Sequence, residues 1–136
     1  MKISNDEITC MRYFYEITNV ECNDCIISDE AIAYLVKTGD MGKAIGKKGV
    51  NIQRLRNFVK KNIFVFEEGQ NEEMFIKKAF NVSNPILQDT EVNNKKVVFI
   101  KLTVSDKSTL RRGAIMQFGK EFFQRVYGKE IKIQSR

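Results

Sequence analysis

The chain has 136 residues, of which 43% are apolar and 29% are charged, and its formal net charge is +6. This length accommodates one ordinary domain or two very small ones, with enough apolar residues for a core. No apolar run approaches the roughly 18 residues of a membrane span, and the first residues lack the apolar segment of a signal peptide. We therefore expect a cytoplasmic protein with no membrane partner.

The sequence lacks the residues on which most catalytic and metal sites depend. It has no histidine, which is the commonest general base and metal ligand. Its three cysteines, Cys10, Cys22 and Cys25, include one CxxC pair and nothing that would complete a four-ligand zinc site. We interpret them as small buried or half-buried thiols, with a disulfide inside the CxxC pair or to Cys10 as the alternative. We expect no enzyme activity, catalytic residue, metal, cofactor or small-molecule substrate.

Helix and strand patterns follow one another in a definite order in the first half of the chain. Ser4 and Glu7 have the spacing of a capping box, and apolar residues recur on one helical face after them. Asp29-Glu30 separates two β-rich runs, and Asp40 is placed to cap a short helix. These patterns predict a helix over 5–18, strands over 25–28 and 31–37, a short helix over 41–45, a basic amphipathic helix after residue 49 and a strand over 62–66.

The second half shows the same order after a polar stretch at residues 67–70. Asn71 can cap a helix in which acidic residues come first and lysines last, as the helix dipole favours. Asn93-Asn94 is typical of a hairpin turn, and Gly128 of a helix end. These patterns predict a helix over 71–80, strands over 86–92 and 97–104, a short turn or helix over 106–112, a long helix between Gly113 and Gly128, and a strand over 130–133.

The order helix–strand–strand–short helix–helix–strand therefore occurs twice, over residues 1–68 and 69–136, and it predicts an α+β fold with an internal repeat. Charge alternates along the chain as well. Residues 40–66 carry seven basic and one acidic side chain, residues 92–136 carry eleven and three, and the segments before each are acidic. Basic surface in both halves favours an anionic partner.

A glycine turn, Gly46-Lys47-Lys48-Gly49, connects the second and third helices predicted for the first half. Its spacing fits neither a Walker A loop nor GxGxxG, so nucleotide hydrolysis has no support. It fits the GXXG loop with which KH domains clamp about four nucleotides of a single strand. Together with the order of elements, this loop predicts two tandem type II KH domains. Each would have its helices on one face of a three-stranded mixed sheet.

Three kinds of contact are expected around this loop. Backbone N–H groups of Lys47, Lys48 and Gly49 would meet phosphates at the start of a helix, and basic side chains would add charge. Ile45, Ile52 and the strand over 31–37 would line a groove for the bases. The predicted RNA-binding residues are Lys43, Ile45, Gly46, Lys47, Lys48, Gly49, Asn51, Ile52 and Arg54.

The whole chain resembles the archaeal NusA-like transcription elongation/termination factors, which are short proteins made of two fused type II KH domains. The similarity is carried by residues 39–54, and within them by Gly42, Ile45, Gly46, Lys47, Lys48, Gly49, Asn51 and Ile52. The resemblance implies a factor that binds single-stranded RNA during transcription elongation or termination, with RNA polymerase as a candidate partner.

In the second half, Leu110-Arg111-Arg112-Gly113 occupies the position of the GXXG loop and keeps only its last glycine. The Cβ of Leu110 is expected to weaken the clamp, although arginine guanidinium groups suit phosphate oxygens. Lys107, Arg111, Arg112 and Gly113 are therefore candidates for a second RNA contact. The aromatic residues of the following helix are predicted to belong to the core rather than to stack on bases; they are Phe118, Phe122, Phe123 and Tyr127.

Two other functions are compatible with the same residues. A KH protein of rRNA processing or ribosome assembly would use the same clamp, so the sequence does not separate it from a transcription factor. A scaffold that docks RNA polymerase through its acidic segments, 1–39 and 67–91, would bind RNA only weakly.

Overall fold

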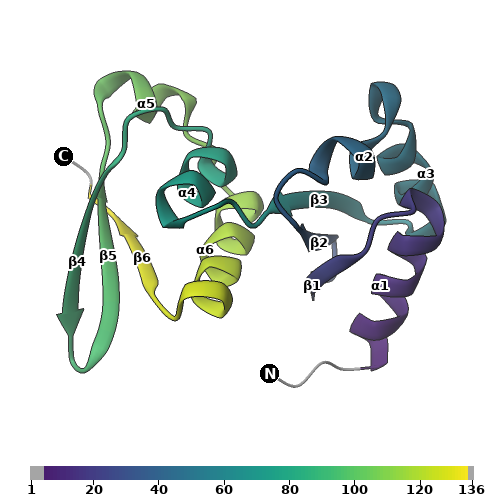
Figure 1. Ribbon diagram of the computed structural model, residues 1–136, viewed down its shortest axis with the longest axis horizontal. Helices are drawn as coiled ribbons and strands as arrows, with labels where there is room; N and C mark the ends of the chain where they lie inside the picture. Colours follow the sequence, from purple (N-terminus) through teal and green to yellow (C-terminus); the bar gives the residue numbers. More distant parts are fainter. Residues whose placement is uncertain (1–4, 135–136) are drawn as a thin grey trace. The chain divides into compact units, whose positions relative to one another are not determined.

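The computed structural model describes residues 5–134 and divides into two compact units, Met1–Glu68 and Gly69–Arg136. Figure 1 labels the elements of both units. Each unit contains its own three-stranded sheet and its own helices, and each is described separately below. The architecture of both is mixed α+β.

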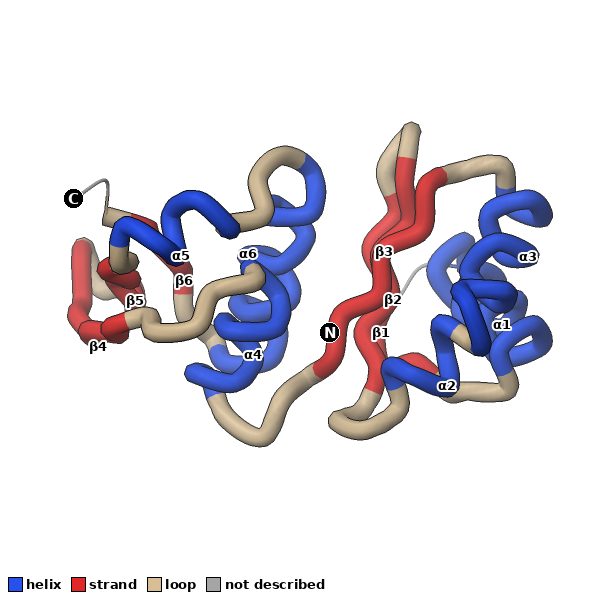
Figure 2. Tube along the Cα trace, turned by 90° about the horizontal axis from the view of Figure 1, so that it is seen from above, coloured by secondary structure: helices blue, strands red, loops and turns tan. Residues whose placement is uncertain are grey.

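The first unit has one antiparallel and one parallel pair of strands. Its sheet has the order β1-β2-β3, with β1 antiparallel and β3 parallel to the central strand β2. Its helices lie together on one face of this sheet (Figure 2). The elements are α1 (Asn5–Thr18), β1 (Cys22–Ile27), β2 (Ala31–Val36), α2 (Met41–Ile45), the 3₁₀ turn η1 (Lys47–Gly49), α3 (Val50–Val59) and β3 (Asn62–Glu67).

The core of the first unit joins the helices to the sheet. Phe14 of α1 and Tyr34 of β2 are fully buried with their ring centroids 4.3 Å apart, and the Tyr34 hydroxyl donates a hydrogen bond to the Cys10 carbonyl. All three cysteines are free, with Cys25 buried and the other two half-buried, as predicted. Burial raises the pKa of the Cys22 thiol to about 12, so this thiol is uncharged at neutral pH.

One strand boundary and one helix cap in the first unit differ from the prediction. Strand β1 begins at Cys22 rather than at Cys25, so the CxxC pair lies within a strand that has a register irregularity between Cys22 and Asp24. The Asp40 side chain makes no cap hydrogen bond to α2. Its backbone carbonyl instead accepts from the Ala44 amide at 3.0 Å, because Asp40 itself has helical dihedral angles.

The second unit repeats the order of the first. Its sheet has the order β4-β5-β6, with an antiparallel pair β4–β5 and a parallel pair β5–β6. Phe118, Phe122 and Phe123 are buried, which confirms their predicted place in the core. The elements are α4 (Glu72–Phe80), β4 (Ile86–Val92), β5 (Lys95–Lys101), α5 (Val104–Thr109), α6 (Ala114–Tyr127) and β6 (Glu130–Ile133).

Capping residues explain where the helices of the second unit begin and end. The Asn71 side chain accepts from the Met74 amide at 2.8 Å, and Gly128 ends α6 with a φ of 70°, as predicted. The predicted strand over 97–104 is wrong at its end, because Val104 is the first residue of α5 and is 85% exposed. The cause is Thr103, whose hydroxyl accepts from the Asp106 amide at 3.0 Å and starts a helix.

Candidate nucleic-acid interface

The first loop, residues 46–49, is a tight left-handed turn between α2 and α3. Gly46, Lys48 and Gly49 have φ values of 79°, 56° and 75°. The Gly49 amide donates to the Gly46 carbonyl at 3.0 Å, and the Val50 amide donates to the Lys47 carbonyl. The side chains of Lys47 and Lys48 are exposed. The loop therefore holds two cations outward on a backbone that glycine makes accessible.

Asn51 explains why Gly46 has to be a glycine. A Cβ on Gly46 would lie 2.8 Å from both Cγ and Nδ2 of Asn51 and 3.1 Å from its backbone nitrogen. The same Asn51 side chain donates from Nδ2 to the Lys43 carbonyl at 3.1 Å, so it ties the start of α3 to α2. Asn51 therefore occupies the space that the missing Cβ leaves and fixes the loop between the two helices.

The backbone amides of the first loop divide into two groups. The Gly49 amide, which was predicted to face a phosphate, is used inside the loop, so this part of the prediction is wrong. In the described part of the chain, no backbone hydrogen bond outside the helices uses the amides of Lys47 or Lys48. These two amides, together with the N-terminus of the ten-residue helix α3, are the donors that the loop offers to an anion.

The strand beside the predicted base groove is β3, whereas the strand over 31–37, which is β2, was predicted to lie there. Strand β2 is the central strand and all six of its residues are buried, so it does not line an open groove. The edge strand on the side of α2 and α3 is β3. Its Val65 and the α3 residue Ile52 are both half-buried against the same core, and Ile45 at the end of α2 is also half-buried. The strand order, which sequence reasoning could not supply, decides this.

The remaining predicted residues of the first unit lie on its surface. Lys43 projects from α2 and Arg54 from α3, and both are exposed. Lys43 also contributes the carbonyl that Asn51 holds. The structure therefore brings the predicted cations to the two helices that flank the loop.

The second loop, residues 110–113, is built differently. Leu110 has a φ of −57° and ψ of 128°, and only Gly113 is left-handed, with a φ of 81°. The Arg111 amide, at the position of Lys47, donates to the carbonyl of Phe80 at 3.1 Å. Thr109 Oγ1 donates to the Asn81 carbonyl at 2.9 Å. The second loop is thus attached to the end of α4. Its Arg111 amide, which corresponds to a donor of the first loop, is already hydrogen-bonded.

A hollow of about 320 Å³ adjoins the second loop and combines cations with apolar side chains. Lys107, Arg112 and Lys120 supply the charge, whereas Arg111 is not part of its lining. Arg112 Nη2 also donates to the Lys107 carbonyl at 3.5 Å. Sequence reasoning missed Lys120, although its position four residues after Met116 on α6 places both on one helical face. The full lining is Leu102, Lys107, Leu110, Arg112, Met116, Lys120, Ile133 and Gln134.

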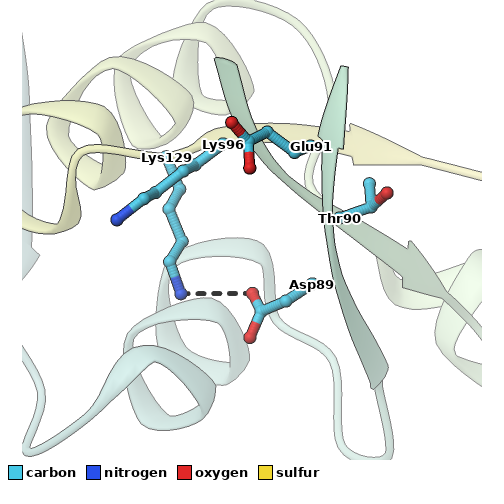
Figure 3. Close-up of a pocket in the computed structure, with 5 residues that line it drawn as sticks. All are labelled: Asp89, Thr90, Glu91, Lys96 and Lys129. Carbon is cyan, nitrogen blue, oxygen red and sulfur yellow. Dashed lines mark hydrogen bonds and ion pairs between the residues drawn. The ribbon is translucent and has the colours of Figure 1, made fainter. Parts of the chain in front are cut away.

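A second hollow of about 410 Å³ in this unit is lined by residues that form a structural ion pair. Lys129, which directly precedes β6, reaches Asp89 on β4 at 3.1 Å (Figure 3). It also pairs with Glu72 of α4 at 2.9 Å. The hydrogen bonds that Lys129 donates, first to Glu72 and then to Asp89, raise the pKa of its ammonium group. This lysine therefore holds a helix, a hairpin and a strand together.

Residues 5–134 contain neither a cluster of metal ligands nor a helix suited to cross a membrane. No group of three or more metal-ligating side chains within them is placed to hold a metal ion. None of the helices in this range is long and apolar enough to cross a membrane.

The fold and the first loop together define a class of protein. An α-β-β-α-α-β unit with a mixed sheet and a GXXG turn between its middle helices is a KH-type unit. A family model for the KH domain matches residues 12–106, and the chain belongs to this family.

Particular relatives narrow the class. The chain is 33% identical over 106 residues to a protein of Methanocaldococcus jannaschii named "Probable transcription termination protein NusA", over 75% of this chain and 56% of that protein. A protein of Methanococcus vannielii with the same name is 32% identical over 130 residues, over 93% of this chain and 71% of its own length. The chain thus spans just over half of the first relative.

A solved structure agrees over nearly the whole chain. The crystal structure of APE1850 matches with a TM-score of 0.78 and 30% identity. The match covers 97% of this chain and 100% of that one. The chain therefore shares its fold with that protein and belongs among the NusA-like KH proteins.

Proposed function

We propose that the protein binds single-stranded RNA and acts in transcription elongation or termination, with the RNA backbone clamped by the first loop. We further propose that its two units are tandem type II KH domains over residues 1–68 and 69–136. The observation that carries the proposal is the first loop. Lys47 and Lys48 are exposed there, no backbone hydrogen bond outside the helices of residues 5–134 uses their amides, and Asn51 ties the loop between α2 and α3.

The chemistry of this clamp is electrostatic and weakly selective. Phosphates would accept from the amides of Lys47 and Lys48 while the side chains of Lys43, Lys47, Lys48 and Arg54 add charge. Bases would lie against Ile45 and Ile52, beside Val65 of β3. Gly46, Gly49 and Asn51 shape the loop. Affinity should fall with salt by about 0.7 log units per phosphate contact for each log unit of salt.

The second unit contributes less to RNA binding in this proposal. Its loop lacks the first glycine, and its Arg111 amide is already bonded to Phe80. Lys107, Arg112 and Lys120 still surround an apolar hollow large enough for part of a nucleotide. Arg111 is exposed and would contact the RNA backbone through its side chain only.

The role in transcription rests on the relatives rather than on the loop. Proteins named for transcription termination match most of this chain, so we propose the same process here, with RNA polymerase as a partner. Co-purification from native cells should recover polymerase subunits. Recovery of ribosomal proteins alone would assign the protein to rRNA processing or ribosome assembly instead.

The clamp is tested by titrating labelled single-stranded RNA at low salt against Lys47→Asp/Lys48→Asp. We expect an affinity about 100-fold weaker than that of the unmodified protein, because two attractive charges become repulsive. Arg12→Asp/Lys60→Asp is the matched control, since it makes the same charge change on exposed residues of the same unit. Equal losses in the two variants would show that only net charge matters, and no loss in either would contradict the clamp.

A further inference from the structure

The outer face of the second sheet carries an aromatic residue among lysines. Asp89 and Ile133 point toward the helices, because Asp89 pairs with Lys129, which also bonds to α4, and Ile133 lines a hollow with α6. Side chains alternate along a strand, so Phe99, Lys101 and Lys132 point the other way. Figure 2 shows α4 and α6 on one side of this sheet.

The strand register places polar groups around Phe99. Phe99 lies on the central strand β5, opposite Gln88 on β4 and Lys132 on β6. Directly opposed side chains lie about 5 Å apart at Cβ, and Lys101 follows on the same face two residues later. Phe99 is half-buried, whereas Gln88, Lys101 and Lys132 are exposed. A partly exposed ring therefore lies on the central strand, with an amide side chain on one neighbouring strand and two lysines close by on the same face.

We propose that this face, defined by Gln88, Phe99, Lys101 and Lys132, is a second binding surface for single-stranded RNA, separate from the loop and groove of either unit. A base stacks on the Phe99 ring, and the two lysines hold the flanking phosphates. The Gln88 amide can both donate to and accept from a base edge. The inference takes its ligand class from the proposed function and adds a site to it.

Charge favours RNA over other occupants of this face. Lys95, Lys101 and Lys132 outnumber Glu130, the acidic residue on the same side of β5 and β6. A second copy of the chain would bring the same lysines against each other and be repelled. An acidic protein would pair with the lysines without using the exposed part of the Phe99 ring, whereas every RNA base has a face that can stack on an aromatic side chain.

The test uses uridine-rich RNA that contains 5-iodouridine, which crosslinks to stacked aromatic residues. We expect a crosslink at Phe99 in the unmodified protein and also in Lys47→Asp/Lys48→Asp, whose first loop is disabled. Phe99→Leu should lose the crosslink and weaken the residual binding of the loop variant about tenfold, while Phe99→Tyr keeps both. Thermal melting identifies any variant that fails to fold, and Phe99→Tyr keeps the test decisive in that case.

Charge is tested separately with a matched pair of variants. Lys101→Gln/Lys132→Gln should lower the slope of log affinity against log salt by about 1.4, or 0.7 for each phosphate contact. Lys77→Gln/Lys96→Gln, which removes the same charge from α4 and from the other face of β5, should not change the slope. Equal slopes for the two variants would overturn the proposal.

The outcomes separate this inference from the proposed function. If the unmodified protein binds RNA but neither the crosslink nor the slope depends on the face, the inference fails while the clamp stands. If the unmodified protein does not bind RNA at all, the proposed function fails. Self-association that these substitutions abolish, with RNA affinity unchanged, would assign the face to a second copy and overturn the inference.

Discussion

The two loops differ in how they are held, and the difference is larger than one lost glycine. An offset of 64 residues places Leu110 at the position of Gly46, Ile115 at that of Asn51, and Lys107 at that of Lys43. The carbonyl of Lys43 accepts from the Asn51 amide, whereas the carbonyl of Lys107 accepts from the Arg112 guanidinium. Each loop is therefore tied to the helix that precedes it, α2 or α5, but by a different donor.

The second loop is a structural connection to the end of α4. With Ile115 in place of Asn51, no amide side chain requires the space of a missing Cβ. Leu110 adopts an ordinary extended conformation instead, and the Arg111 amide bonds to the end of α4. No backbone hydrogen bond outside the helices of residues 5–134 uses the Lys47 amide, whereas the corresponding Arg111 amide is bonded within its own unit. We conclude that loss of the glycine and loss of the amide belong to one change of conformation.

Gly46→Ala should produce the largest difference between the loops. Its Cβ would overlap the Asn51 side chain at 2.8 Å, and its φ of 79° is unfavourable for alanine. We expect the first unit to lose about 2–3 kcal/mol of unfolding free energy and most of its RNA affinity. Gly113→Ala meets no atom within 4 Å and should cost only about 1 kcal/mol, from its φ of 81°. Thermal melting and RNA titration of both variants measure this, and equal costs would contradict the role of Asn51.

Asn51→Ala tests the same contact from the other side. Loss of the bond to the Lys43 carbonyl should cost about 1 kcal/mol and weaken RNA binding by disordering the loop. In the double variant Gly46→Ala/Asn51→Ala the new Cβ no longer meets a side chain. The two costs should therefore be less than additive, with a coupling of about 1 kcal/mol. Ile115→Ala is the corresponding change in the second unit and should leave RNA affinity unaltered; strict additivity in the cycle would refute the contact.

Local patterns were enough to predict most elements of this fold. The periodicity of α1 and α6, the cap at Asn71 and the turn at Asn93-Asn94 depend on neighbouring residues, and the structure confirms them. The predicted end of β5 was wrong. The alternation of hydrophobic residues continues to Val104, but the Thr103 hydroxyl accepts a hydrogen bond that starts a helix there. A short-range cap overrode a strand pattern there.

Only the part of the candidate site that is formed by neighbouring residues in the sequence could be predicted. Residues 46–52 form one continuous segment, so their spacing revealed the turn. The prediction that β2 lines the groove was wrong. Strand order is a tertiary property, and it places β2 in the centre of the sheet and β3 at the edge. The bond between the Arg111 amide and Phe80 joins residues 31 positions apart, and no pattern in either segment indicates it.

Asp106 should make the second unit more sensitive to acid than the first. Its buried carboxylate accepts from the Ser83 and Asn84 amides at 2.9 and 2.8 Å, and these bonds lower its pKa. Because the folded pKa lies below the unfolded value of about 3.9, the stabilisation is present above that pH and is lost as pH falls through the folded pKa. Asp106→Asn should destabilise the second unit at neutral pH. It should also reduce the fall in the unit's unfolding free energy as the pH is lowered, which is the acid limb of its stability profile. Amide hydrogen exchange followed by unit measures both, and an unchanged acid limb would contradict this role.

Lys129→Gln should give the smallest effect, again confined to the second unit. The ammonium pairs with Glu72 and Asp89, and its side chain is only 20% exposed, but Asp89 is 71% exposed, so solvent screens part of the network. We expect a loss of about 0.5–1 kcal/mol at low salt and less at high salt. Since the folded pKa is raised, the stabilisation should be present at neutral pH and lost only as pH rises through that pKa, above about 10.4. Denaturant unfolding at two salt concentrations, with Lys96→Gln as the control, measures the difference. A loss that does not depend on salt would mean that Lys129 acts through the packing of its stem, and the tie between α4 and β4 would then be apolar rather than ionic.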